Sequence, residues 1–222
     1  MLDIPGADLF SDFDPDEVAA IHAQYVSERE ADGQARAIRR QSRHQMRRAK
    51  AQAHLAELLP ARFVPGESWH VISHGDIDAQ SYFQHAINGV EYFDFVLIST
   101  WCICKDNLLA LESWLDAGKI DRLSLLMGEI FPSRYGDEYE FSLRLQKDYG
   151  VQFVVARNHS KITLAANYAE KYFLVIESSA NSNANPRIEQ TVIQADQALY
   201  DFYLEFFSGI RSIDRDSARA PR

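Results

Sequence analysis

The chain has 222 residues, of which 46% are hydrophobic and 12% aromatic, and it carries a net charge of −9. This composition is typical of a folded protein with a substantial core, and it excludes a disordered chain. No apolar run approaches the roughly 18 residues of a membrane span. Acidic residues stand near the N-terminus, where a signal peptide would have lysine or arginine. We therefore expect a cytoplasmic protein with no membrane partner.

Basic residues are concentrated in one segment. Seven of them and no acidic residue lie between Gln34 and Lys50, which leaves 16 basic against 32 acidic residues elsewhere. The spacing i, i+4, i+7, i+11 places four arginines on one helical face, namely Arg36, Arg40, Arg43 and Arg47. Such a stripe suits the phosphate backbone of a nucleic acid. A solvated charged face and a contact with an acidic partner surface are the alternatives.

The first 60 residues are predicted to be a helical, Arg-rich extension. Asp14 and Pro15 form a typical helix start, and helical character continues to Leu59, with a break near Gly33. Pro60 ends this region, because proline cannot continue a helix.

Strands and helices alternate after residue 61. The expected strands are 69–73, 92–101 and 122–127, and the expected helices are 77–87, 107–117 and 138–149. Four closer strands follow, at 151–158, 161–168, 172–179 and 188–195. This order predicts an α/β domain over 61–211, with a mixed, largely parallel sheet flanked by helices.

The chain is expected to end in a helix and a polar tail. Asp196 caps a helix over 197–207, and a polar tail follows over 212–222. We expect the apolar side chains of this helix to pack inward, namely Leu199, Phe202, Tyr203, Phe206 and Phe207.

Polar groups gather at the ends of the closely spaced strands. His159 and Lys161 open one strand and point the same way, because side chains two apart share a face. Ser178, Ser179, Asn181 and Glu189 follow the next strand. Other candidates at a strand end are Ser99, Thr100 and Trp101.

This set of groups suits phosphoryl transfer without a metal or cofactor. An imidazole such as that of His159 can attack phosphorus, while Lys161 and Asn181 supply donors for the phosphoryl oxygens. Glu189 can accept the other imidazole N–H, which fixes the tautomer. Ser178 and Ser179 would support the phosphate. The two cysteines, Cys102 and Cys104, have no histidine beside them, and we expect buried thiols and no zinc site.

At these residues the chain resembles the phospholipase D superfamily. The family motif is His-x-Lys, then Gly-Ser-x-Asn after a hairpin, then a glutamate; the matching residues here are His159 to Lys161, Ser178 to Asn181, and Glu189. The chain departs from the motif at two positions, with Ala166 where the family usually has Asp and Ser178 where it has Gly. The 16 residues between Lys161 and Ser178 also exceed the usual spacing, which predicts an extended or bulged hairpin.

The resemblance implies a metal-independent phosphodiesterase, most simply a nuclease acting on DNA or RNA through a phosphohistidine. Single-motif members of the family form dimers around a shared site. We therefore expect an isologous homodimer through the motif face, in which one His159 is the nucleophile and the other is the general acid.

Three alternatives remain open at this point. The fold can be a catalytically weakened nucleic-acid-binding or assembly protein, since Ala166 and Ser178 depart from the motif. A lipid hydrolase is a further option, although no helix has the aromatic apolar face of a membrane binder. Finally, His159 and Lys161 can be ordinary polar residues at a strand end, because edge strands carry lysine to discourage pairing.

Overall fold

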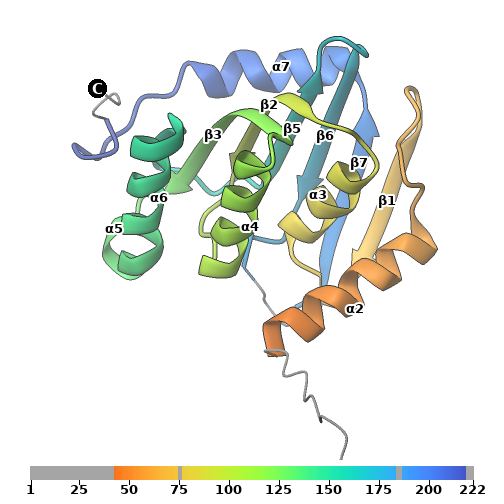
Figure 1. Ribbon diagram of the computed structural model, residues 1–222, viewed down its shortest axis with the longest axis horizontal. Coiled ribbons are helices and arrows are strands. Elements are labelled where there is room, and N and C mark those ends of the chain that lie inside the picture. Colours follow the sequence, from red (N-terminus) through yellow and green to blue (C-terminus); the bar gives the residue numbers. More distant parts are fainter. Residues whose placement is uncertain (1–42, 75–76, 184–186, 219–222) are drawn as a thin grey trace, which may run out of the picture. The chain divides into compact units, whose positions relative to one another are not determined.

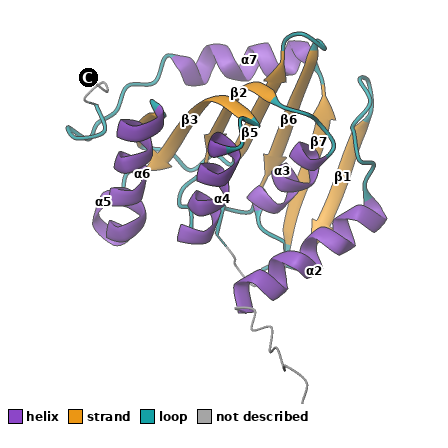
Figure 2. Ribbon diagram, in the orientation of Figure 1, coloured by secondary structure: helices purple, strands orange, loops and turns teal. Residues whose placement is uncertain are grey.

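The computed structural model describes residues 43–74, 77–183 and 187–218, and it forms seven strands and six helices there (Figures 1 and 2). The strands are β1 Ser68–Ser73, β2 Phe93–Ser99, β3 Ile120–Gly128, β4 Gln152–Ala156, β5 Ile162–Asn167, β6 Tyr172–Ser178 and β7 Glu189–Ala195. The helices are α2 Arg43–Leu58, α3 Ala79–Asn88, α4 Lys105–Asp116, α5 Phe131–Arg134, α6 Gly136–Tyr149 and α7 Gln197–Ser208.

The seven strands form a single mixed sheet in the order β1-β7-β6-β5-β2-β3-β4. Only β2 with β3 and β3 with β4 pair in parallel, whereas the other four pairings among the described residues are antiparallel. The expectation of a largely parallel sheet was therefore wrong. Part of the reason is local: only residues 168–171 join β5 to β6, and so short a connection joins antiparallel neighbours.

Helices cover both faces of the sheet. On one face, β2 side chains such as Val96 and Ile98 pack with residues of α3 and α4, including Phe83 and Leu108. Leu97 belongs to a second, smaller cluster, together with Tyr200 and Phe207 of α7. Figure 1 shows α7 apart from α3 and α4. This alternation follows from the period of two along a strand.

The described part of the predicted extension packs against the sheet's helices. α2 contributes Ala51 and Leu55 to the larger core, and Leu59 follows directly after the helix. Gln52 Nε2 donates to the Ser81 carbonyl of α3 over 2.7 Å. The remainder of the extension, residues 1–42, lies outside the described residues.

The last helix buries a narrower face than expected. Tyr200 and Phe207 are buried, but Phe202 and Phe206 are 65% and 67% exposed. The expectation that all five apolar side chains of α7 pack inward was therefore wrong for these two. An apolar helical face wider than the contact with the sheet leaves its flanks in solvent.

The polar tail is bonded to the edge strand β4 over its described part. The Ile213 amide donates to the Val155 carbonyl over 2.9 Å, and the Val155 amide donates to Ser212 Oγ over 3.1 Å. Asp214 accepts from Tyr139 of α6 and from the Ser217 amide, at 2.8 and 2.9 Å. These bonds cover part of a strand edge that would otherwise expose unpaired backbone groups.

Candidate phosphoryl-transfer site

The motif residues meet at one edge of the sheet. Ser99, at the end of β2, lies opposite Ile162, which begins β5, and Ile162 lies opposite Glu177 near the end of β6. The next pairing in this row joins Glu177 to Val192 near the start of β7. The segments that carry His159, Asn181 and Glu189 therefore converge where these strands begin or end.

His159 and Lys161 are in direct contact. The Lys161 ammonium lies 2.9 Å from His159 Nδ1 and donates to the His159 carbonyl over 2.6 Å. His159 Nε2 lies 3.4 Å from the same ammonium. Because a protonated lysine only donates, a neutral ring with its proton on Nε2 would accept at the nearer nitrogen, Nδ1. His159 is exposed, whereas Lys161 is buried. The imidazole is thus accessible to a ligand, and the ammonium lies behind it.

Burial changes the acidity of Lys161. Its loss of solvation lowers the pKa below the ordinary value of 10.5, and the nearby Cys102 thiol and Glu189 carboxylate oppose this shift. Because burial disfavours the charged form, an anion that enters the pocket would stabilise the Lys161 ammonium and raise this pKa.

Asn158 fixes the turn that carries His159. Its Oδ1 accepts from the Ser160 amide and hydroxyl, at 3.0 and 2.6 Å. Its Nδ2 donates to Ser99 Oγ over 3.0 Å and lies 3.2 Å from the Thr100 carbonyl. The Ser160 and Ser99 hydroxyls are themselves 2.6 Å apart. The residues on both sides of His159 are thus tied to the end of β2.

Trp101 forms a wall beside the imidazole. The centroids of its ring and of the His159 ring are 5.6 Å apart, with the planes tilted by 55°. Gly128, at the end of β3, makes room for this indole, because a Cβ there would overlap Trp101 Cδ1. It would also lie 3.0 Å from the Asn158 carbonyl oxygen.

The serine at the motif's glycine position has a structural role. Ser178 Oγ accepts from the Ala180 amide over 3.1 Å and lies 2.8 Å from Thr191 Oγ1 of β7. These bonds fix the start of the segment that leads to Asn181. The hairpin before it is extended and not bulged, because β5 and β6 pair in continuous register from Ile162–Glu177 to Asn167–Tyr172.

Asn181 is held by its carbonyl oxygens. Its side-chain Oδ1 accepts from the Trp101 amide over 3.3 Å and from Thr100 Oγ1 over 3.4 Å. Its main-chain carbonyl accepts from the Ala79 amide over 3.2 Å. Because Oδ1 is the bonded atom and Nδ2 has no hydrogen bond to a described residue, the amide group remains available as a donor.

Glu189 bonds to Ser179 and not to His159. The Ser179 hydroxyl donates a short hydrogen bond to Glu189 Oε2 and accepts from the Gln190 amide over 3.0 Å. Within the described part of one chain, no hydrogen bond joins Glu189 to the imidazole. Glu189 acts on this site through its charge near Lys161.

A pocket of about 530 Å³ opens at this edge, on the side of the sheet that carries Ile162 and Glu177. His159, Lys161, Ser178 and Ser179 line it, whereas Asn181 and Glu189 do not. Tyr203 of α7 donates to Glu177 Oε1 over 2.5 Å. The sequence-predicted residues therefore divide into four that line one pocket and two beside it.

Ala166 lies away from this pocket. It is fully buried in the cluster under α7, and it pairs with Phe95 and Phe173. Five residues along a strand separate it from Lys161, which corresponds to roughly 16 Å. Here the position of the motif's Asp is part of the apolar core.

The arginine stripe is largely outside the described residues. Arg36 and Arg40 fall there, and Arg43 and Arg47 lie in α2, where their side chains are not described. The neighbouring Arg48 is described, and its guanidinium donates to Asn107 Oδ1 over 2.7 Å.

Sequence reasoning did not single out Asn158 or the buried Asn107. The only signal for Asn158 is its place between a buried strand and the motif histidine, where asparagine often bonds the backbone two residues on. Nothing in the local pattern marks Asn107, because its partners lie far apart in the sequence.

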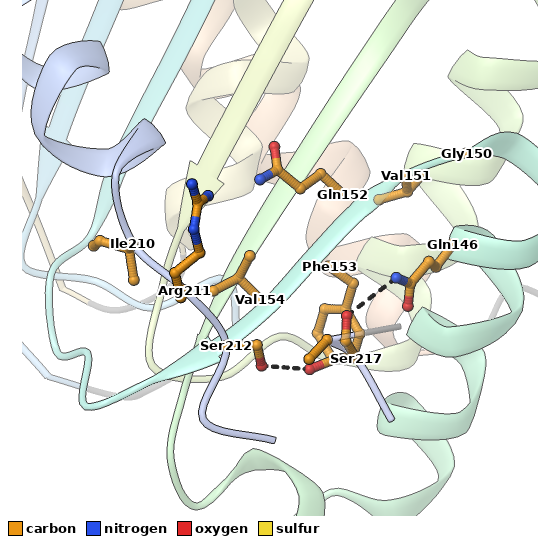
Figure 3. Close-up of a pocket in the computed structure, with 11 residues that line it drawn as sticks. Gln146, Gly150, Val151, Gln152, Phe153, Val154, Ile210, Arg211, Ser212 and Ser217 are labelled. Atoms are coloured by element: carbon orange, nitrogen blue, oxygen red, sulfur yellow. Dashed lines mark hydrogen bonds between the residues drawn. The ribbon is translucent and has the colours of Figure 1, made fainter. Parts of the chain in front are cut away.

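A second pocket, of about 390 Å³, lies between the edge strand β4, the end of α6 and the tail (Figure 3). Gln146 and Ser217 bond across it, and Arg211 is its one charged lining residue. It has no nucleophile paired with a base, which distinguishes it from the His159 pocket.

The described residues contain neither a membrane-spanning helix nor a cluster of metal ligands. None of their helices is long and apolar enough to cross a membrane. Among them, no group of three or more His, Cys, Asp or Glu side chains is arranged to hold a metal ion.

The comparisons with known proteins rest on structure. No protein-family model and no curated protein matches the sequence. Among solved structures, polyphosphate kinase from Porphyromonas gingivalis matches with a TM-score of 0.50 and 14% identity, over 67% of this chain. TrmBL2, an archaeal chromatin protein with a novel mode of DNA binding, matches over 92% of this chain and 68% of its own, with a TM-score of 0.48 and 11% identity.

Phosphatidylserine synthase from Haemophilus influenzae matches with a TM-score of 0.45 and 14% identity, over 64% of this chain. The chain spans 27% of the kinase and 37% of the synthase. The likeness to the kinase shows that this chain has the same general fold class, a mixed sheet flanked by helices.

Proposed function

We propose that this protein is a metal-independent phosphodiesterase, most simply a nuclease acting on DNA or RNA through a phosphohistidine intermediate. One observation carries the proposal: an exposed imidazole in a pocket is backed by a buried ammonium only 2.9 Å away. A nucleophile paired with a cation suits attack on a phosphodiester, whose oxygens gain charge in the transition state. The general fold class shared with polyphosphate kinase is compatible with this chemistry.

In the first step, a phosphoryl oxygen replaces the imidazole as the acceptor of the Lys161 ammonium, and Asn181 Nδ2 donates to a second oxygen. The unprotonated ring nitrogen of His159 then attacks phosphorus. A P–N bond forms, and the P–O bond to the leaving group breaks. The leaving oxygen takes a proton from a general acid, so that an alcohol departs.

In the second step, water hydrolyses the phosphohistidine. The group that gave its proton to the leaving oxygen now takes one from water, which attacks phosphorus. The P–N bond breaks, and a phosphate monoester and free His159 result. The same group therefore serves as acid and then as base.

A second chain would supply that group. Among the described residues that line the pocket, His159 is the one imidazole. A two-fold axis at the mouth of the pocket would bring His159 of a second copy to the opposite side of the phosphorus. The site would then hold two imidazoles, two Lys161 ammonium groups and two Asn181 amides.

Nucleic acid is the substrate class that we propose, because a stripe of Arg36, Arg40, Arg43 and Arg47 can follow a phosphate backbone. A chain with a net charge of −9 repels polyanions as a whole, so a local basic segment would be needed to hold one. Binding should weaken steeply with salt, and neutralising one phosphate contact should reduce the salt slope by about 1.

The test is cleavage of single- and double-stranded DNA and RNA in EDTA by the full chain, compared with His159→Ala. We expect cleavage that persists in EDTA and falls at least about 1,000-fold in His159→Ala, because the nucleophile is removed. Wild type incubated with labelled substrate and then denatured at alkaline pH should carry a labelled phosphoryl group that acid releases. His70→Ala is the matched control, since His70 is exposed on β1 and does not line the pocket.

Two outcomes would contradict the proposal. Equal cleavage by His159→Ala would show that another group does the chemistry. Salt-sensitive nucleic-acid binding without turnover in the wild type would instead identify a binding or assembly protein built on this fold.

A further inference from the structure

A buried polar cluster lies behind the segment that carries Asn181. Its centre is Asn107, in the first turn of α4, whose side chain is 0% exposed. Its Nδ2 donates to Asp78 Oδ2 over 3.0 Å and to the Ser182 carbonyl over 2.8 Å. Its Oδ1 accepts from Arg48 over 2.7 Å. The hydrogen-bonding groups of this carboxamide are thus used, as a fully buried amide requires.

The partners of Asn107 come from three separate parts of the chain. Arg48 belongs to α2, Asp78 caps the N-terminus of α3, and Ser182 lies in the loop between β6 and β7. The other oxygen of Asp78 accepts from the Ser81 amide and hydroxyl, both at 2.8 Å. Asn107 therefore joins the starts of two helices to this loop, and Arg48 adds a third helix.

The loop residue that Asn107 holds is the neighbour of Asn181. The Ser182 carbonyl also accepts from the Cys104 amide over 3.0 Å, and the Asn181 carbonyl accepts from the Ala79 amide over 3.2 Å. Both carbonyls thus lie at helix N-termini, where the free amides and the helix dipole favour them. With the backbone fixed in this way, the Asn181 side chain keeps Oδ1 on Trp101 and presents Nδ2 as the donor.

We propose that Asn107 is a positioning residue for Asn181, and that its bond to Arg48 makes the placement of Asn181 depend on helix α2. The proposal rests on the proposed function, in which Asn181 Nδ2 donates to a phosphoryl oxygen. Loss of the Nδ2 donors of Asn107 removes one of the two hydrogen bonds to the Ser182 carbonyl, leaves only that from the Cys104 amide, and lets the Asn181 amide shift from its place. A displacement of about 1 Å at a catalytic group can lower the rate roughly 100-fold.

The experiment compares the same substitution at two buried asparagines. Asn107→Asp keeps an acceptor for Arg48 and removes the donors to Asp78 and Ser182. Asn167→Asp is the control, because Asn167 is also 0% exposed and bonds the Tyr92 carbonyl at the far end of β5. We expect kcat to fall about 10- to 100-fold in Asn107→Asp with KM changed less than about twofold, and to stay near wild type in Asn167→Asp.

A double variant separates positioning from general damage. If Asn107 acts through Asn181, the variant Asn107→Asp/Asn181→Ala should be no slower than Asn181→Ala alone. The proposal would be overturned if the double variant were slower than Asn181→Ala by the full factor that Asn107→Asp causes alone. It would also be overturned if Asn167→Asp lost as much kcat as Asn107→Asp. Should Asn107→Asp fail to fold, Arg48→Met removes one bond of the cluster and should lower kcat about threefold to tenfold through the same non-additive pattern. Wild-type kcat in a folded Arg48→Met would overturn the dependence on α2.

A second measurement keeps this proposal distinct from the proposed function. The side-chain amide signals of Asn181, assigned by their loss in Asn181→Ala, can be followed by NMR without any substrate. They should shift or broaden in Asn107→Asp and stay in place in Asn167→Asp. If the wild type shows no turnover, the proposed function fails while this comparison still decides the positioning; unchanged Asn181 signals in Asn107→Asp would overturn it.

Discussion

At the scale of single residues, the site combines an exposed imidazole with a buried ammonium. Burial of a lysine is unfavourable unless its donors are satisfied, and Lys161 meets this need with the ring and the carbonyl of His159. Both acceptors belong to the residue that we propose as the nucleophile. A phosphate oxygen entering the pocket would therefore be a stronger acceptor than the one it replaces.

The lowered pKa of Lys161 predicts an alkaline limit to activity. Burial stabilises the neutral amine, so a rise in pH removes the ammonium at a pH below the ordinary lysine value of 10.5. The pH profile of kcat/KM should fall there. Glu189→Gln removes an opposing charge and should move this limb to lower pH, whereas Lys161→Arg should remove the limb because arginine stays charged. An alkaline limb that is unchanged in both variants would contradict this assignment.

Several residues could be found from the sequence, and others could not, for a physical reason. The sequence placed four polar residues at the ends of two strands that are neighbours in the chain. These residues line one pocket: His159, Lys161, Ser178 and Ser179. The hydrogen bond expected from His159 to Glu189 was not found within one chain, since Ser179 takes that carboxylate. Side-chain partners separated by 59 residues, as for Arg48 and Asn107, leave no periodic signal in a sequence.

At the scale of elements, the sheet's two faces decide what each strand position tolerates. β5 sends Leu164 and Ala166 to the cluster under α7 and Ala165 to the larger core. The motif's aspartate would thus place a carboxylate among apolar side chains in this chain. An alanine fits among these apolar side chains. We therefore interpret Ala166 as a residue of the core and not as the remnant of a catalytic aspartate.

Restoring the motif aspartate should therefore destabilise the fold. Ala166→Asp buries a carboxylate with no partner and should lower the free energy of unfolding by on the order of 3 kcal/mol. Ala169→Asp is the matched control, because Ala169 is exposed in the turn after β5 and should change stability by less than about 0.5 kcal/mol. Urea unfolding measures both. Wild-type stability of Ala166→Asp would contradict the predicted cost of burying this carboxylate, and a gain in activity would show that position 166 takes part in the site.

The tail that covers β4 should loosen in acid. Burial alone would raise the pKa of Asp214, but hydrogen bonds from the Ser217 amide and the Tyr139 hydroxyl outweigh it and hold the pKa below 3.8. A depressed carboxyl pKa gives stability that is present above the unfolded value and is lost as the pH falls through the folded one. The protection factor of the Ile213 amide against hydrogen exchange should therefore fall below about pH 3.8 before those of β2 and β3.

Tyr139→Phe should move this transition to higher pH, because it removes one of the bonds that lower the pKa of Asp214. Exchange at Ile213 that stays coupled to the central strands at every pH would contradict the account of the tail.

The order and type of most elements could be predicted from the sequence. The helix expected over 138–149 is α6 at Gly136–Tyr149, and Gly150 ends it with a φ of 69°. The strand expected over 172–179 is β6 at Tyr172–Ser178. The direction of strand pairing and the width of the buried helix faces could not be predicted from the sequence, because both depend on which elements pack together in the folded chain. The antiparallel half of the sheet and the exposed Phe202 and Phe206 are the examples.

At the scale of the whole molecule, the proposed chemistry needs more than one chain. A phosphodiester needs a nucleophile and an acid for the leaving group, and the described pocket holds one imidazole. A two-fold assembly supplies the second one without any new residue type.

The most direct test of this central claim is the activity of mixed assemblies. Wild type and His159→Ala, each with its own tag, would be co-expressed over a range of ratios, and activity per total protein would be measured in EDTA. If each site needs His159 from both chains, activity falls as the square of the wild-type fraction, to about a quarter at an equal mixture. A linear fall, to about a half, would show that each chain works alone and would contradict the shared site.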